Sequence, residues 1–99
     1  MKTRQLEPIH PGETLLEEFM APLDMSAHAL ALALRVPATR IGDIVRGRSS
    51  ITPDTALRLA RYFGTSPDLW LGLQSEYDLR VARRELSARI ERDVEPRSA

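Results

Sequence analysis

Two similar tripeptides, "TPD" at residues 52–54 and "SPD" at residues 66–68, place the starts of two helices in this chain. In each tripeptide the hydroxyl residue can cap a helix, the proline suits the first helical position, and the helix dipole favours the acidic side chain. Gly64 lies between them and can end the earlier helix in a left-handed conformation. Helices are therefore predicted over residues 53–63 and 67–92.

Similar signals divide the N-terminal half of the chain. Apolar residues at helical spacing follow "PGE" at residues 11–13, and Pro22 ends that pattern. Ser26 is a suitable N-cap for the next helix. Pro37 suits the first turn of a third helix, which Gly47 closes. The predicted helices in this half are residues 12–21, 27–34 and 38–46.

The composition agrees with a helical fold. Hydrophobic residues make up 42% of the 99 positions but only 5% are aromatic, so the core must consist mainly of Leu, Ala, Ile and Val. No alternating strand pattern of useful length is present. We predict an all-α fold of five helices with an extended last helix, forming a single domain over residues 1–94 with a flexible tail over residues 95–99.

Several classes of site and protein are excluded or disfavoured. The chain contains no cysteine, which excludes disulfides and thiolate metal sites, and His10 and His28 lack a carboxylate at ligand spacing, so no metal is expected. No Ser/His/Asp arrangement, glycine-rich phosphate loop or paired-carboxylate site can be assembled, and we therefore expect neither an enzyme nor a cofactor. The longest apolar stretch, residues 29–34, is too short to cross a membrane, which indicates a cytoplasmic protein without a membrane partner.

The formal net charge is zero, but the charges are unevenly distributed. Residues 1–25 contain five acidic and two basic side chains, and residues 26–63 contain six arginines and two acidic side chains. Residues 64–99 contain six arginines and seven acidic side chains. A basic centre therefore lies between acidic flanks, and this pattern favours a nucleic-acid-binding surface in the middle of the chain.

The helices predicted over residues 27–34 and 38–46 are separated by about three residues, the spacing of a helix-turn-helix unit. Ile41, Ile44 and Val45 form one apolar stripe on the second of these helices, whose opposite face is polar or small. No core needs that opposite face, so we expect it to enter the major groove of DNA. The candidates for base contacts are Ala38, Thr39, Arg40, Gly42, Asp43 and Arg46.

The residue types in this segment suit base recognition. Small residues allow a close approach, and the methyl group of Thr39 can contact thymine. Arg40 and Arg46 can bind guanine bidentately or hold phosphates, and Asp43 can accept a hydrogen bond from cytosine. Amides at helix starts, together with nearby hydroxyl or basic side chains, can bind phosphate oxygens. The phosphate-contact candidates are Ser26, Ala27, His28, Arg48, Ser49 and Thr52.

The last predicted helix carries two apolar stripes, which is more than one small bundle can cover. Trp70 and Tyr77 share the first stripe and are expected to be packing anchors. We expect the second stripe to bury another copy of the chain, because two-fold pairing would also supply a palindromic DNA site. The candidates for this homodimer interface are Leu79, Leu86 and Ile90.

Four blocks of sequence resemble a known family: "HPGETLLEEFMAPL", "IVRGR", "TALRLARYFGTSPDLWL" and "LQSEYDL". Over residues 8–82 the chain is similar to the HigA family of helix-turn-helix antitoxins, within the lambda-repressor-like (XRE) superfamily. The resemblance implies a dimer that binds its own double-stranded operator DNA and neutralises a HigB-type, RelE-like endoribonuclease toxin. Arg35 occupies a position where the wider superfamily commonly has glycine, so a strained turn is expected.

Two other functions agree with the residues alone. A stand-alone repressor of the XRE type would have the same fold but no toxin partner. A protein-interaction module would use Arg40, Arg46 and Arg48 at the rim of a protein interface and would not bind DNA. The acidic N-terminal segment would suit a basic partner electrostatically.

Overall fold

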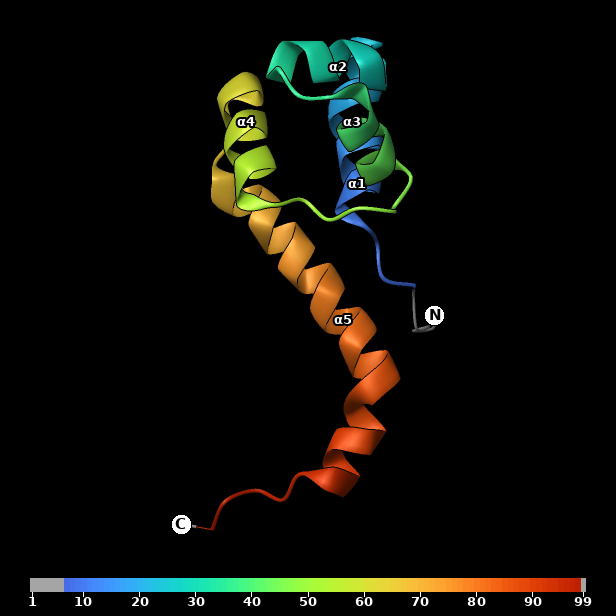
Figure 1. The fold of residues 1–99 in the computed structure, drawn as a ribbon, viewed down its shortest axis with the longest axis vertical. Coiled ribbons are helices and arrows are strands. Elements are labelled where there is room, and N and C mark those ends of the chain that lie inside the picture. The colour runs from blue at the N-terminus through green and yellow to red at the C-terminus, as the bar shows by residue number, and fades with distance from the viewer. Residues whose placement is uncertain (1–6, 99) are drawn as a thin grey trace.

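The computed structural model describes residues 7–98, and every regular element in that range is helical (Figure 1). The elements are α1 (Pro11–Thr14), which continues as a π-helical segment (Leu15–Met20) and a 3₁₀ turn (Ala21–Leu23), α2 (Ala27–Leu34), α3 (Ala38–Val45), α4 (Pro53–Phe63) and α5 (Pro67–Asp93). The predicted all-α fold with an extended last helix is confirmed. The predicted domain and tail also include residues 1–6 and 99, which lie outside the described residues, while residues 94–98 are exposed and non-helical.

Side-chain caps start four of these helices. The hydroxyls of Ser26, Thr52 and Ser66 each accept a hydrogen bond from the backbone N–H three residues further on, at 3.0, 3.4 and 3.1 Å. The fourth cap is His10, whose Nδ1 accepts a hydrogen bond from the Gly12 N–H at 2.9 Å and so starts α1. Each of these bonds joins residues close in sequence, so the starts of the helices depend little on the rest of the fold.

The first helix, predicted over residues 12–21, is not α-helical along its whole length. Its hydrogen-bond ladder widens, so that the Ala21 N–H donates to the Leu16 carbonyl, five residues back. Pro22 has no N–H with which to continue the ladder, and the chain leaves the helix at Asp24, which has a left-handed φ of 54°. The expected helix is present, but a short apolar pattern does not distinguish an α-helical turn from a π-helical one.

Trp70 has no exposed surface and lies in the core. Its indole Nε1 donates to the Thr65 hydroxyl at 2.8 Å, and its ring packs against Phe19 with 4.9 Å between the ring centroids. All five helices, counting the π-helical extension of α1, contribute to the buried apolar cluster. Its other members are Leu15, Met20, Leu30, Ala31, Leu34, Ile41, Ile44, Ile51, Ala56, Leu59 and Ala60.

A buried glutamine joins α5 to the loop before α4. Gln74 Oε1 accepts a hydrogen bond from the Ile51 N–H at 2.7 Å, and its Nε2 donates to the Asp78 carboxylate at 2.9 Å. The Ile51 N–H is buried, so this side chain provides the partner that a buried backbone group requires. Gln74 thereby ties the loop that follows α3 to the longest helix.

The C-terminal half of α5 extends away from the other helices (Figure 1). Leu79 near the middle of α5, and Leu86 and Ile90 in its C-terminal half, have 47%, 39% and 49% of their surfaces exposed. Despite its length, α5 is too polar to span a membrane, and none of the other described helices combines the necessary length and apolarity.

A glycine lies where the first helix packs against α3. A Cβ atom built on Gly12 would lie 1.8 Å from the Ile44 carbonyl oxygen and 2.9 Å from the Val45 Cα atom, well inside van der Waals contact. Gly12 is buried, and both of these neighbours are backbone atoms that cannot rotate away. The absence of a side chain at Gly12 therefore determines how close α1 lies to α3.

Gly12→Ala is expected to lower the free energy of unfolding by about 3 kcal/mol, because the new methyl group must displace the backbone of α3. Urea denaturation followed by circular dichroism measures the change. Gly72→Ala is the matched control, since a Cβ atom at this exposed position in α5 meets nothing within 4 Å. This control should stabilise the protein by about 0.5–1 kcal/mol. Equal stabilities for the two variants would contradict the close contact at Gly12.

Candidate nucleic-acid interface

Backbone hydrogen bonds hold the turn between α2 and α3, where Arg35 replaces the expected glycine. Arg35 adopts a left-handed conformation, with φ 61° and ψ 45°. Its N–H donates to the Leu32 carbonyl at 3.2 Å, and the Val36 N–H donates to the Ala31 carbonyl at 3.0 Å, the Schellman arrangement. A left-handed arginine costs about 1 kcal/mol. The strained turn expected from the sequence is therefore present.

The polar face of α3 is outside because its apolar stripe is buried. Ile41 and Ile44 have no exposed surface, so rotation of α3 about its axis would expose both of them to water.

The predicted base-contact residues divide into three groups by their exposure. Ala38, Thr39 and Arg46 are exposed, Arg40 and Asp43 are half-buried, and Gly42 is buried.

Gly42 lies beside the Arg46 side chain. A Cβ atom built on Gly42 would lie 3.0 Å from Arg46 Nη1, which is tighter than an ordinary contact. Gly42 itself is buried. In this structure the glycine leaves room for the Arg46 guanidinium to lie along the helix, and its own backbone is not presented to the outside.

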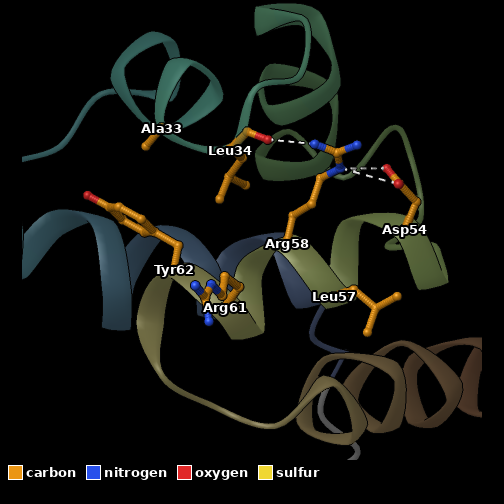
Figure 2. A pocket seen from close by; sticks show the side chains of 7 residues that line it. All are labelled: Ala33, Leu34, Asp54, Leu57, Arg58, Arg61 and Tyr62. Atoms are coloured by element: carbon orange, nitrogen blue, oxygen red, sulfur yellow. Dashed lines mark hydrogen bonds and ion pairs between the residues drawn. The ribbon is translucent and has the colours of Figure 1, made fainter.

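A cluster of charged residues connects α3 to α4. Arg40 Nη1 on α3 donates to the Asp54 carboxylate at 2.5 Å. Arg58 Nε, one turn further along α4, donates to both oxygens of the same carboxylate at 3.1 and 3.2 Å. The Arg58 Nη1 group also donates to the Leu34 carbonyl at 2.8 Å, as Figure 2 shows. This cluster of Arg40, Asp54, Arg58 and the Leu34 carbonyl, called here the Asp54 cluster, joins α2, α3 and α4.

The two guanidinium groups determine the ionisation of Asp54. The hydrogen bond from Arg40, followed by the one from Arg58, lowers the pKa of the Asp54 carboxyl below its ordinary value. The carboxylate is therefore ionised at neutral pH and compensates one of the two positive charges. The Asp54 cluster carries a net charge of +1 close to the exposed face of α3.

Only part of the Asp54 cluster could be found in the sequence. The sequence places Asp54 in the first turn of α4, and its spacing of four residues from Arg58 is the ordinary spacing of a helical ion pair. The contact with Arg40 joins residues fourteen positions apart, and the contact of Arg58 with Leu34 spans twenty-four. No pattern within one helix predicts either contact.

The predicted phosphate-contact residues lie at three places. Ser26, Ala27 and His28 are at the start of α2, and Thr52 is the N-cap of α4. The remaining two follow α3 directly. The backbone N–H groups of Arg48 and Ser49 both donate to the Asp43 carbonyl, at 2.8 and 3.2 Å. Ala27 and Ser49 are half-buried, and Ser26, His28, Arg48 and Thr52 are exposed.

His10 lies against the loop that follows α3. The His10 ring meets Tyr77 edge-on, with 4.8 Å between the centroids. Burial lowers the pKa of His10, and a hydrogen bond with the Ser49 backbone and the charge of Asp78 act in the opposite direction. A neutral ring keeps the Nδ1 lone pair that caps α1. The described residues contain no group of three or more His, Asp or Glu side chains that could hold a metal ion.

An open groove of about 550 Å³ lies between α2 and α4, beside the Asp54 cluster (Figure 2). Its lining residues are Ala33, Leu34, Asp54, Leu57, Arg58, Arg61 and Tyr62. The lining residues include no serine, histidine or cysteine. The groove combines apolar side chains with the Asp54 carboxylate, the Tyr62 hydroxyl and the guanidinium groups of Arg58 and Arg61.

Comparison with known proteins agrees with the helix-turn-helix geometry. The family model described as Helix-turn-helix matches residues 16–70, which extend from the first helix into α5. Virulence-associated protein I of Dichelobacter nodosus is 52% identical over 81 residues, which cover 82% of this chain and 75% of that protein.

Two solved structures of antitoxins have the same fold. The structure of the Pseudomonas aeruginosa antitoxin HigA with the higBA promoter is 49% identical, has a TM-score of 0.88, and is covered over 97% of its length by 90% of this chain. The structure of the antitoxin GraA in complex with its operator is 39% identical and has a TM-score of 0.89, with complete coverage of both chains. Nearly the whole chain is therefore similar to antitoxins seen with promoter or operator DNA.

Proposed function

Because this chain belongs to the XRE-like helix-turn-helix family, among the HigA antitoxins, we propose that it represses its own operon as a homodimer and neutralises a HigB-type, RelE-like endoribonuclease. The chain is a DNA-binding antitoxin by family. One observation in its own structure carries the DNA-binding part, namely the exposed polar face of α3 opposite the fully buried Ile41 and Ile44. The chain acts by binding, and we expect no catalysis from it.

The residues on and beside the face of α3 support binding in the major groove of operator DNA. Thr39 on α3 and Arg46 at its C-cap are both exposed, and there a methyl group and a guanidinium can reach base edges. The capped starts of α2 and α4 present backbone N–H groups at the positive ends of their helix dipoles. Arg48 adds an exposed positive charge after α3. Phosphate contacts from these groups would fix the register of α3 on the duplex.

Binding to the DNA upstream of the gene is expected to depend on arginines of α3. The double variant Arg40→Ala/Arg46→Ala should lose at least about tenfold in operator affinity, because each bidentate base contact discriminates strongly. Fluorescence anisotropy over a series of salt concentrations measures this loss. The log–log salt slope should also become shallower by about 0.9 for each phosphate contact that is lost.

The matched control for this experiment is Arg89→Ala/Arg92→Ala, which removes the same charge from the exposed C-terminal end of α5. It should leave operator affinity within about twofold of wild type, since screening weakens the effect of distant charges. Wild-type affinity for the operator no higher than for unrelated DNA would contradict the proposal and favour a protein-interaction module.

The exposed stripe on α5 supports a homodimer. Leu79, Leu86 and Ile90 follow one another at intervals of seven and four residues, so they share one side of the helix. Leu86 and Ile90 belong to the C-terminal half of α5, which extends beyond the other helices (Figure 1), and Leu79 lies near the middle of α5. Pairing through this stripe would remove apolar surface from water and would place two copies of α3 in a two-fold arrangement for a palindromic site.

Leu86→Glu is expected to convert the dimer to a monomer at tens of micromolar protein, because a buried, unpaired carboxylate opposes association. Size-exclusion chromatography with light scattering measures the molar mass. Ala88→Glu is the control, since it adds the same charge at an exposed position about 200° around the helix from Leu86. A wild-type monomer, or equal effects of the two substitutions, would contradict this interface.

The acidic first helix supports a basic protein partner. Glu13, Glu17 and Glu18 are all exposed, and Asp24 at the end of the helix is exposed too. An enzyme that cleaves RNA must bind a polyanion and therefore presents positive charge, which this surface would complement. The acidic side chains lie on the first helix and at its end, and not on α3. One chain can therefore offer separate surfaces to DNA and to a toxin.

The protein encoded beside this chain's gene is expected to co-purify with it and to lose its RNA-cleaving activity in the complex. Cleavage of a defined messenger RNA during translation in vitro measures that activity. The variant Arg40→Ala/Arg46→Ala should neutralise the toxin as well as wild type does, because its changes lie on α3. If the neighbouring protein neither binds nor is inhibited, the chain is a stand-alone repressor.

A further inference from the structure

In the Asp54 cluster, a residue of α4 holds the guanidinium group of Arg40, which lies on α3. Arg40 lies on the side of α3 that faces α4, and its Nη1 group is held by Asp54 at 2.5 Å. Its side chain is 38% exposed, and only that one nitrogen is occupied in this contact. The other guanidinium N–H groups of Arg40 are available to a base edge or a phosphate oxygen.

We propose that Asp54 is a positioning residue that makes Arg40 discriminate operator DNA from other DNA. Asp54 has this role only if the chain binds operator DNA as proposed above. An unrestrained arginine samples many rotamers and can follow phosphates of any sequence, because phosphate contacts carry no sequence information. An arginine held at one Nη group presents a fixed donor edge, as bidentate recognition of a base requires.

The carboxylate that holds Arg40 is itself held. Arg58 donates from Nε to both oxygens of Asp54, and its Nη1 group bonds the Leu34 carbonyl at the end of α2. Leu34 directly precedes Arg35, the strained residue of the turn. A continuous set of hydrogen bonds thus extends from the turn, through Arg58 and Asp54, to Arg40, and it couples the orientation of Arg40 to the geometry of the helix-turn-helix unit.

The charge of Asp54 has a separate effect that does not depend on sequence. A carboxylate close to bound DNA repels the phosphates of operator and non-operator DNA alike, so it lowers both affinities and leaves their ratio unchanged. Its side chain is 54% exposed, and exposed ion pairs contribute little to folding stability. A purely stabilising role would therefore be small, whereas a role in orienting Arg40 would appear in the ratio of operator to non-operator affinity.

The test measures binding of Asp54→Asn to operator DNA and to a non-operator duplex of the same length and base composition, over a series of salt concentrations. The ratio of the two affinities is expected to fall about tenfold, because Arg40 loses its fixed orientation toward a base. Non-operator affinity should rise about twofold to threefold, since one repulsive charge is gone. Asp54→Glu keeps the carboxylate and should restore most of the ratio.

Two controls distinguish the positioning of Arg40 by Asp54 from an effect on folding stability and from an effect of the net charge of the protein. In the Arg40→Ala background, Asp54→Asn should leave the affinity ratio unchanged, because the residue through which Asp54 acts is absent. Glu76→Gln removes a carboxylate from a comparable exposed ion pair on α5, the 2.7 Å contact with Arg80, and should leave the ratio unchanged in the wild-type background. Thermal unfolding of every variant reports on the fold independently.

An unchanged ratio in Asp54→Asn would overturn the inference, whether or not the melting temperature falls. An equal fall of the ratio in the Arg40→Ala background would overturn it too, because Asp54 would then act without Arg40. Operator binding that is retained in these cases leaves the proposed function intact. A wild-type chain with no operator preference would contradict the proposed function and this inference together.

Discussion

The burial of one side of α3 is the constraint on which the rest of the structure depends. Ile41 and Ile44 have no exposed surface, so the rotation of α3 about its axis is determined by the core. Gly12 lets the first helix approach the α3 backbone more closely than any side chain would permit. Once α3 is placed in this way, its polar residues must face outward, and the candidate DNA-binding surface follows from core packing.

The turn before α3 contains a residue in an unfavourable backbone conformation, and neighbouring contacts offset its cost in free energy. Arg35 is left-handed although it has a side chain, and the two Schellman hydrogen bonds hold it in place. Arg58 adds a bond from α4 to the carbonyl of Leu34. Strain of this kind persists only where the surrounding structure determines the backbone, and such positions are often found at functional sites.

Exposed surfaces of different chemistry lie on different helices of this chain. The polar face of α3 and the starts of α2 and α4 belong to the helix-turn-helix part of the chain. The C-terminal half of α5, which carries part of the apolar stripe, extends beyond that part (Figure 1). The exposed carboxylates of the first helix form a further surface of opposite charge. These three surfaces differ in chemistry as the three partners proposed above do, namely DNA, a second copy of the chain and a basic protein.

Much of the fold follows from interactions between residues close in sequence. The hydroxyl caps at Ser26, Thr52 and Ser66 act within three residues, so the sequence determined where α2, α4 and α5 begin. The spacing of Ile41 and Ile44 likewise determined which face of α3 is polar. The π-helical widening of the first helix was not predictable, because its apolar spacing over a few turns resembles that of an α-helix.

The contacts that join the helices were decided only by the tertiary structure. Gln74 meets Ile51 across twenty-three residues, Arg40 meets Asp54 across fourteen, and Gly12 meets a backbone carbonyl on another helix. In the sequence, Gln74 is an ordinary polar position in a helix, and Gly12 lies at the start of a helix. Arg40 and Asp54 are two charged residues with no visible relation to one another. The physical reason is that caps and apolar stripes depend on the local backbone, whereas the partner of a buried amide or of a charged side chain depends on how the helices pack.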